Sequence, residues 1–312
     1  MQNTKKEGGY MGKSMYFLEF MQKYNNEDIC IKVAESVRWG DKVISPFDPT
    51  SKVYKCKNHK YRCKNTGRYF TVKTGTCFAR SKLPFMKWFY VMWLFSCHKR
   101  GASSHQIAKD IGVTQKTAWN MLHKIRTTMD KENNYTIDGE VEIDETFAGG
   151  KNKFRHKNKK VKKCQGRSNK DKTPVFGMLG RNGDIVAKVV IDTKAKTLLP
   201  FIQKYIIKGS TIYTDGWSYK GIEVDYNQLS VDHDKKFYGK TCYNENKETV
   251  MITTNAIENA WSIFKRMYAT YYKISKKYMQ NYVNEFVFRF NTRKLSDSDR
   301  FRLLLQYKVN AA

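Results

Sequence analysis

The first 80 residues mix short apolar clusters with turns. Two stretches, 52–56 and 68–72, have the composition of strands, and Gly75 ends the second. From 85 to 98 the chain is apolar on all sides, and Pro84 precedes it where a helix tolerates proline in its first turn. Because no polar face remains for solvent, we expect this helix to be buried.

Two shorter amphipathic helices follow and are joined by Gly112. Ser103 or Ser104 can cap the first, and Thr114 can cap the second. Coming after a longer helix, the pair has the spacing of a helix-turn-helix. In such motifs the start of the second helix contacts base edges, so the predicted DNA-reading residues are Gln115, Lys116, Thr117 and Asn120. An ordinary helical hairpin with a solvated polar face fits the same pattern.

After Gly139 apolar and polar residues alternate, which is the pattern of a β-strand. A strand ending near Asp144 precedes a hairpin, and helices and further strands then alternate. The expected elements are the hairpin strands 174–180 and 184–192, a helix at 196–205, strands at 211–215 and 229–233, and helices at 255–272 and 277–290. This order predicts an α/β fold, a mixed sheet with helices packed on it.

The net positive charge of the chain indicates which kind of molecule it binds. The 58 Lys and Arg residues outnumber the 29 Asp and Glu residues, which gives a net charge of +29. A polyanion is the natural partner for such an excess, and the basic residues spread along the whole chain, which favours nucleic acid over a membrane surface. The longest apolar run, Trp88–Cys97, has about half the residues of a membrane span. The N-terminal charges precede no hydrophobic segment and the seven cysteines are scattered, so we expect an intracellular protein with free thiols.

The most basic stretch, 151–173, has eleven Lys or Arg residues against one Asp. It lacks apolar periodicity, so we expect a loop that holds phosphates and whose affinity for nucleic acid falls steeply with salt. The predicted phosphate contacts are Lys157, Lys159, Lys160, Lys162 and Lys163.

Three carboxylates stand where a catalytic crevice is expected. Asp144 and Asp215 end predicted strands, and Glu258 lies in the first turns of a helix. Acids that converge repel one another unless divalent cations hold them, and oxygen ligands suit Mg²⁺ or Mn²⁺. Two such ions about 4 Å apart can promote phosphodiester displacement.

Lys265 follows Glu258 by two helical turns on the same stripe, where it can bind a phosphate near the metals. From periodicity alone, a Glu and a Lys on a solvated helix face fit as well.

Several ordered motifs resemble the ISXO-type insertion-sequence DDE transposases and their eukaryotic relatives, the Merlin elements. The motifs are Val141–Thr146, Ile212–Trp217, Thr254–Arg266, Tyr282–Asn291, and Gly75–Thr76 with Lys82–Pro84 and Trp88; the resemblance covers about residues 36 to 295. It implies an RNase H-like catalytic fold that cuts DNA with metal ions to expose a 3′-OH and then joins that end to target DNA.

By this resemblance Asp144, Asp215 and Glu258 are the metal-binding triad, and Lys265, followed by Arg266, is the basic residue after the glutamate. His233 matches a family position near the substrate, although a hydrogen-bonded histidine at a strand end explains it equally. Transposition requires two DNA ends to be brought together, so the resemblance also implies a dimer or larger assembly on double-stranded DNA.

One departure concerns the zinc ribbon that precedes the helix-turn-helix in this family. Ser45 and Asp48 occupy the first pair of cysteine positions, and only Cys63 remains of the second pair. A structural zinc site needs four ligands, so we predict a ribbon-like segment without zinc. An improvised site from Cys56, His59, Cys63 and Cys77 has irregular spacing.

The resulting prediction has four parts: a degenerate ribbon (1–80), a helix-turn-helix (81–130), an RNase H-like catalytic domain (138–295) and a C-terminal tail (296–312). Two other functions remain open. One is a DNA-binding protein without catalysis, such as a transcription factor or a domesticated transposase; the other is a metal nuclease that cuts without joining. The compartment is the cytoplasm and nucleoid of a bacterium or the nucleus of a eukaryote, where residues 157–163 would suit an import signal.

Overall fold

The computed structural model describes residues 15–129, 136–150, 152–162, 170–181, 183–215, 222, 224–231, 240–243 and 249–310. The chain divides into two compact units. Unit 1 combines Met1–Thr128 with Thr292–Ala312, and unit 2 is Met129–Asn291. Both ends of the chain therefore belong to the same unit, and unit 2 is inserted between them.

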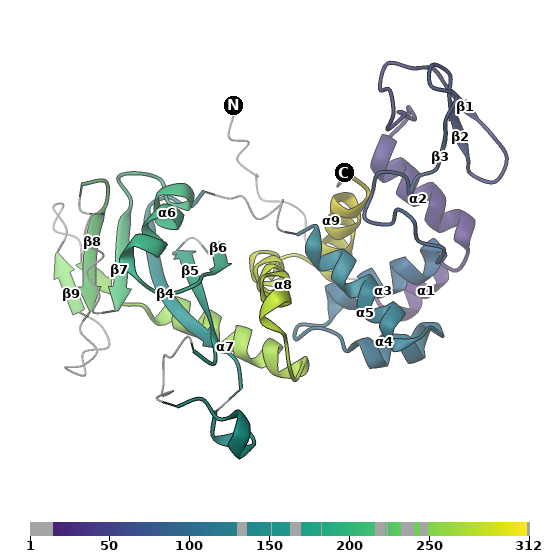
Figure 1. Cartoon of the computed structure of the whole chain (residues 1–312). Helices are drawn as coiled ribbons and strands as arrows, with labels where there is room; N and C mark the ends of the chain where they lie inside the picture. The colour runs from purple at the N-terminus through teal and green to yellow at the C-terminus, as the bar shows by residue number, and fades with distance from the viewer. Residues whose placement is uncertain are drawn as a thin grey trace. The chain divides into compact units, whose positions relative to one another are not determined.

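Unit 1 is a helical assembly with a small sheet (Figure 1). Its elements are α1 (Phe17–Lys23), α2 (Glu27–Trp39), β1 (Val53–Lys55), β2 (Tyr61–Cys63), β3 (Tyr69–Phe70), α3 (Phe85–Cys97), α4 (Ser104–Ile111), α5 (Gln115–Thr127) and α9 (Asp297–Asn310). The strands form a three-stranded antiparallel sheet in the order β1-β2-β3. Strands β1 and β3 lie within the predicted stretches, whereas β2 was missed because three residues carry too little periodicity to recognise.

Helix α3 is buried on nearly all sides, as its apolar sequence predicts. Helix α9 packs against both α3 and α2. Phe301 of α9 contacts the rings of Phe20 and Phe89, and Arg300 donates a hydrogen bond of 2.5 Å to the Ser96 carbonyl oxygen. The segment expected to be a tail is thus a core helix, whose apolar stripe was hidden among charged residues. No helix within the described ranges combines the length and hydrophobicity needed to cross a membrane.

Helices α4 and α5 begin at the caps that the sequence indicates. The Ser103 hydroxyl accepts a hydrogen bond from the His105 amide, and Thr114 accepts one from the Thr117 amide. Gly112 forms the turn with a φ of +60°. Of the predicted reading residues on α5, Gln115, Lys116 and Asn120 are exposed and Thr117 is half-buried.

Unit 2 is built on a mixed sheet. Its elements are β4 (Glu140–Ala148), two 3₁₀ turns (Asn152–Phe154 and Lys157–Lys159), β5 (Thr173–Gly180), β6 (Ile185–Val189), α6 (Ala195–Tyr205), β7 (Thr211–Asp215), β8 (Asn227–Val231), β9 (Lys240–Tyr243), β10 (Thr249–Ile252), α7 (Asn255–Thr270), a third 3₁₀ turn (Lys276–Tyr278) and α8 (Met279–Asn291). Five strands pair in the order β6-β5-β4-β7-β8, and β9 pairs with β10. Strands β4, β7 and β8 run parallel, and β5 and β6 are antiparallel to their neighbours. This α/β arrangement is compatible with an RNase H-like domain.

Helices cover both faces of this sheet (Figure 1). Val141 and Ile143 of β4 pack with α6 on one face, whereas Ala148 packs with α7 and α8 on the other. Because strand side chains alternate between faces, Glu142 and Asp144 lie on the α7 side. The binary pattern of β4 therefore directs its carboxylates toward the helix that carries Glu258.

Helix α8 also protects the sheet edge. The Asn291 side chain accepts a hydrogen bond from the Ile185 amide and donates one to the Ile185 carbonyl, at 2.9 and 3.0 Å. Gln280 accepts a bond of 2.7 Å from the Val189 amide. These side chains satisfy the edge of β6, which otherwise presents unpaired backbone groups.

Candidate active site

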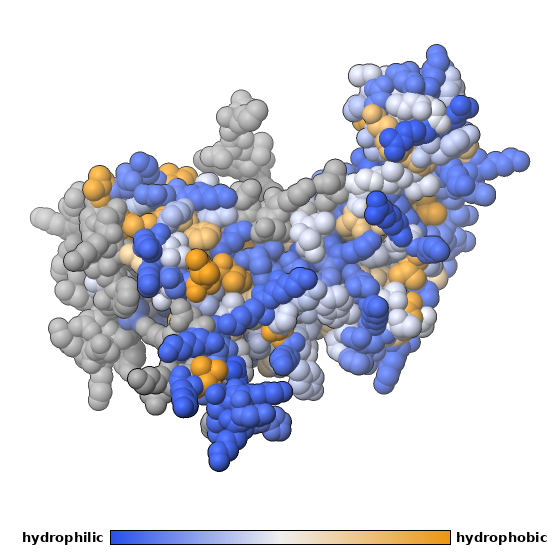
Figure 2. Space-filling model, viewed as in Figure 1, coloured by the Kyte–Doolittle hydropathy of each residue, from blue (hydrophilic) through white to orange (hydrophobic). Residues whose placement is uncertain are grey.

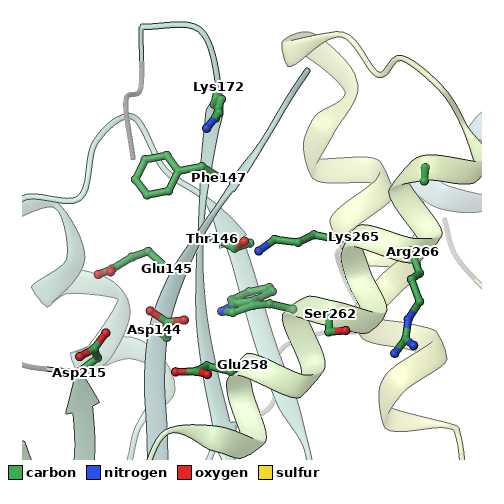
Figure 3. A pocket seen from close by; sticks show the side chains of 12 residues that line it. Asp144, Glu145, Thr146, Phe147, Lys172, Asp215, Glu258, Ser262, Lys265 and Arg266 are labelled. Atoms are coloured by element: carbon green, nitrogen blue, oxygen red, sulfur yellow. The ribbon is translucent and has the colours of Figure 1, made fainter. Parts of the chain in front are cut away.

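A cavity of about 820 Å³ opens in unit 2 beside β4, β7 and α7 (Figure 3). Its lining combines acidic and basic side chains with an aromatic wall. The lining residues are Asp144, Glu145, Thr146, Phe147, Lys172, Asp215, Glu258, Trp261, Ser262, Lys265, Arg266 and Ala269. All three carboxylates singled out from the sequence therefore border one space, although they are far apart along the chain.

Strand register brings two of these carboxylates together. The last parallel pair between β4 and β7 is Ile143 with Thr214, so the next residues along the two strands are Asp144 and Asp215. Neighbouring strands lie about 4.8 Å apart, and side chains in register share a face. The sequence predicted that Asp144 ends its strand. The structure differs, because β4 continues to Ala148 and its last residues pair with β5 alone. It stands where β4 and β7 separate, which opens the space beside it.

Helix α7 supplies the third carboxylate and a cation. Glu258, Ser262 and Lys265 form an exposed stripe that borders the cavity, while Trp261 packs into the core. The Thr254 hydroxyl lies 3.4 Å from Oε1 of Glu258. Figure 3 shows Glu258 near Asp144 and the Lys265 side chain extending toward the cavity. The predicted stripe therefore faces the crevice.

The sequence model of the ISXO2-like transposase domain family matches residues 136–291. The chain belongs to this family. The match begins just before β4 and ends with α8, so it covers the sheet, its helices and the whole cavity. A comparison with curated proteins gives no match.

A buried glutamate ties the transposase sheet to α7. Glu142 is only 1% exposed, and its Oε2 accepts hydrogen bonds of 3.0 Å from the amides of Ala256 and Ile257. Amides at the start of a helix have no carbonyl partner within the helix, and the helix dipole there also favours an anion, so Glu142 satisfies both requirements. Burial raises the pKa of Glu142, against the opposing effects of both amides and Arg181. Sequence analysis missed this residue, although it shares the face of Asp144 by simple alternation.

Arg181 links Glu142 to Glu140, the first residue of β4. Its guanidinium lies 3.2 Å from a Glu140 carboxylate oxygen and 3.4 Å from one of Glu142. The same guanidinium stacks over the Tyr213 ring of β7 at 3.9 Å, and the Tyr213 hydroxyl donates to Glu140 at 2.7 Å. Burial and the Glu140 bond raise the pKa of Tyr213 to about 12. The network fixes β4 and β7 relative to each other next to the carboxylates.

Close packing also sets the distance of α7 from the sheet. Gly177 of β5 pairs with Asp144, and the Trp261 ring lies directly above it. A Cβ at position 177 would lie 2.6 Å from Cη2 of Trp261. Only glycine leaves room for this ring, so Gly177 allows α7 to approach β4 at the level of Asp144.

The donor set of the transposase cavity fits divalent ions of the Mg²⁺ class. Asp144, Asp215 and Glu258 offer only oxygen ligands, and Asp144 and Asp215 are half-buried. Among the residues with described placement, no group of three His, Cys, Asp or Glu side chains has converged to metal-binding distance.

The basic stretch emerges between β4 and β5, next to the cavity wall formed by Phe147 and Lys172. The Asn152 side chain closes it through bonds of 2.8 and 3.1 Å with the Val161 backbone. Figure 2 shows strongly hydrophilic side chains gathered on this projection, which lies at the bottom of the view. Of the lysines predicted to contact phosphates, Lys157, Lys159, Lys160 and Lys162 are exposed. Lys163 and His233 lie outside the described residues.

Arg266 differs from its neighbour. It borders the cavity, but Figure 3 shows its side chain directed away from the carboxylates. The predicted reading residues of α5 belong to unit 1, whereas the cavity belongs to unit 2. The sequence-predicted site residues are thus divided between the cavity and the basic projection of unit 2 and helix α5 of unit 1.

Hydrogen bonds surround Ser45 and Asp48, which the resemblance places at zinc-ligand positions. Ser45 is 1% exposed, and its hydroxyl accepts hydrogen bonds from the amides of Phe47 and Asp48. The Asp48 carboxylate binds the Thr50 hydroxyl and the Asn65 amide, at 2.7 Å each. The segment retains its turn geometry through these bonds, and the absence of zinc stays a prediction.

Cys63 is the remaining thiol at these positions. Burial alone raises the pKa of Cys63, but hydrogen bonds from Ser45, Ser51 and Thr66 lower it to about 6. Of the residues considered for an improvised zinc site, His59 lies 2.9 Å from a carboxylate oxygen of Asp28.

Proposed function

We propose that this chain is an active DDE transposase that binds transposon-end DNA, cleaves one strand with divalent metal ions and joins the new 3′ end to target DNA. The observation that carries the proposal is the adjacent register of Asp144 and Asp215 in the cavity that Glu258 and Lys265 also border. Membership of the transposase family supports the reaction class.

The three carboxylates would hold two Mg²⁺ or Mn²⁺ ions. Bound there, the ions supply Lewis-acid stabilisation of the attacking and leaving oxygens of a phosphodiester. Asp144 and Asp215 come from rigid strands, and Glu258 comes from a helix fixed by Glu142 and Trp261. Rigid supports of this kind hold ligands in place during the reaction.

Cations around the cavity would hold the DNA. Lys265 extends into the cavity toward Thr146 from the same helix as Glu258, which suits a phosphate contact beside the scissile bond (Figure 3). Lys172 lines the cavity at the base of the basic projection, which would bind the duplex further along.

His233 would contact substrate near the metals, as the resemblance implies. Residues Gln115, Lys116, Thr117 and Asn120 would read the end sequence, and Arg266 would contact DNA outside the cavity.

Transposition requires the two ends of the element to be brought together, so we propose that a dimer or larger assembly forms on DNA.

The test of the proposed function uses labelled DNA segments that flank the coding sequence, incubated with the protein and Mg²⁺. Joined product supports a transposase, cut product alone indicates a nuclease, and bound DNA alone indicates a protein without catalysis.

Asp215→Asn separates chemistry from binding. We expect it to abolish cutting and joining while the DNA complex persists, because the side chain keeps its size and loses its charge. Asp184→Asn is the matched control, since Asp184 is an exposed residue of the β5–β6 turn that does not line the cavity. Strand joining by Asp215→Asn at the control rate would refute the assignment.

A further inference from the structure

The three-stranded sheet of unit 1 has one buried face and one exposed face. Tyr61, Cys63 and Phe70 point into a small core with Trp39 and Phe47. Because side chains alternate along strands, the residues between them point outward. The backbone pairs Lys52 with Lys64 and Cys56 with Lys60 extend the same register. The outward positions are Lys52, Tyr54, Cys56, Lys60, Arg62, Lys64 and Tyr69.

Two tyrosines and an arginine cross this exposed face in a row. Tyr54 pairs with Arg62, and Arg62 pairs with Tyr69, so the three side chains lie side by side on adjacent strands. Tyr54 is 43% exposed and Tyr69 is 61% exposed. The Arg62 guanidinium lies 5.7 Å from the Tyr69 ring centroid, and the Lys52 amine lies 5.6 Å from that of Tyr54. Basic groups thus flank accessible aromatic rings.

None of these outward positions is acidic, so the face attracts polyanions. A hollow of about 370 Å³ adjoins it, lined by Lys60, Tyr69, Phe70, Thr71 and Thr74. Its size is at the lower end of the range for pockets that take small planar groups. The face therefore offers cations, two ring surfaces and a recess within one short sheet.

We propose that this face, defined by Lys52, Tyr54, Lys60, Arg62, Lys64 and Tyr69, binds single-stranded DNA. Unpaired bases stack on the two tyrosine rings, and the cations hold the adjoining phosphates. A duplex conceals the faces of its bases, so exposed rings on a flat sheet contribute more to binding an unpaired strand. This site is separate from the proposed catalytic cavity and from helix α5.

The test measures affinity of the full chain without catalysis. Fluorescence anisotropy in EDTA gives the dissociation constants for a labelled oligothymidylate of about 12 nucleotides and for a duplex of equal length. Substituting Tyr54→Ala and Tyr69→Ala together removes both rings, whereas Tyr54→Phe with Tyr69→Phe keeps them. Tyr272→Ala is the matched control, because Tyr272 is 93% exposed and belongs to unit 2.

We expect the double alanine variant to bind the oligothymidylate at least about tenfold more weakly. Its duplex affinity changes far less, and the phenylalanine pair and Tyr272→Ala bind as the wild type does. Unchanged affinity of the alanine variant for the oligothymidylate overturns the proposal. An equal loss for both DNA forms overturns the preference for unpaired bases.

A second measurement keeps the proposal testable if the alanine variant unfolds. The wild-type chain is irradiated with an oligonucleotide containing a halogenated uracil, and the attached peptides are mapped by mass spectrometry. Attachment to Tyr54 or Tyr69 supports the site, and attachment only elsewhere overturns it. Asp215→Asn should bind the oligothymidylate normally, so failure of catalysis and failure of this site give different results.

Discussion

Glu142 and Ile257 are 115 residues apart in sequence, yet the Ile257 amide donates a hydrogen bond of 3.0 Å to Oε2 of Glu142. Glu142 lies two residues before Asp144, and Ile257 lies immediately before Glu258. One buried carboxylate thus links the supports of two proposed metal ligands. Its removal should therefore affect both stability and catalysis.

Replacing Glu142 with alanine should lower the free energy of unfolding by about 1–3 kcal/mol, because it leaves buried amides unpaired. Glu142→Gln keeps an acceptor oxygen and should lose less. In the cleavage assay the alanine variant should lose kcat with a smaller change in KM, since a shift of α7 displaces Glu258 and Lys265 while the lysines of the basic projection remain in place. Urea unfolding and single-turnover cleavage provide both readouts. Full stability and full rate in Glu142→Ala would show that the link is dispensable.

Gly177→Ala should destabilise unit 2 by about 1–3 kcal/mol through overpacking against Trp261. The added methyl group must push the ring, and with it α7, away from β5. Gly150→Ala is the matched control, because nothing lies within 4 Å of its new Cβ, and its effect should stay within about 0.5 kcal/mol. Thermal unfolding followed by circular dichroism compares the two, and equal melting temperatures would contradict the packing argument.

Mg²⁺ should raise the melting temperature of the protein without DNA, because binding relieves repulsion among Asp144, Asp215 and Glu258. At a concentration 100 times the dissociation constant, the stabilisation should be about 2.7 kcal/mol. Asp215→Asn should lose most of this increase, and potassium chloride of equal ionic strength is the control. An equal Mg²⁺ effect in both proteins would place the ion elsewhere.

Cys63 should stabilise the fold in a pH-dependent manner. Hydrogen bonds hold its pKa at about 6, below the ordinary value of 9.0. A depressed pKa means that the stabilisation is full above pH 9.0 and is lost as the pH falls toward 6. The difference in unfolding free energy between wild type and Cys63→Ala should therefore shrink over that range.

Cys30→Ala is the control for this titration. Burial, together with Glu27, raises the pKa of Cys30 to about 12, so this thiol stays neutral in the same window. Its contribution to stability should be constant from pH 6 to about 8 and should fall slightly as the pH approaches 9.0, where the thiol of the unfolded chain ionises. Parallel pH profiles for the two alanine variants would argue against a thiolate at position 63.

The purified protein should contain no stoichiometric zinc, because Ser45, Asp48 and Thr66 stand at three of the four ligand positions that the resemblance implies, and their side chains are engaged in hydrogen bonds. Elemental analysis of protein purified without chelator is the measurement. About one zinc per chain that disappears in Cys63→Ser would refute this prediction.

The sequence by itself determined what depends on local chemistry and on periodicity. The caps of α4 and α5, the buried helix α3 and the β5–β6 hairpin follow from neighbouring residues, so a linear pattern records them. The stripe of Glu258, Ser262 and Lys265 also follows from helical period alone. The α/β class could be predicted for the same reason, whereas the RNase H-like expectation came from the family motifs.

Only the tertiary structure decided which distant residues meet. Strand register sets Asp144 beside Asp215, and no local pattern in either strand encodes that pairing. The burial of Glu142 beneath α7, the space at Gly177 for Trp261, and the return of α9 to unit 1 likewise depend on packing between segments far apart in the chain. Local sequence limits each element to a few conformations, but the burial of shared surface selects their partners, and that selection builds the cavity.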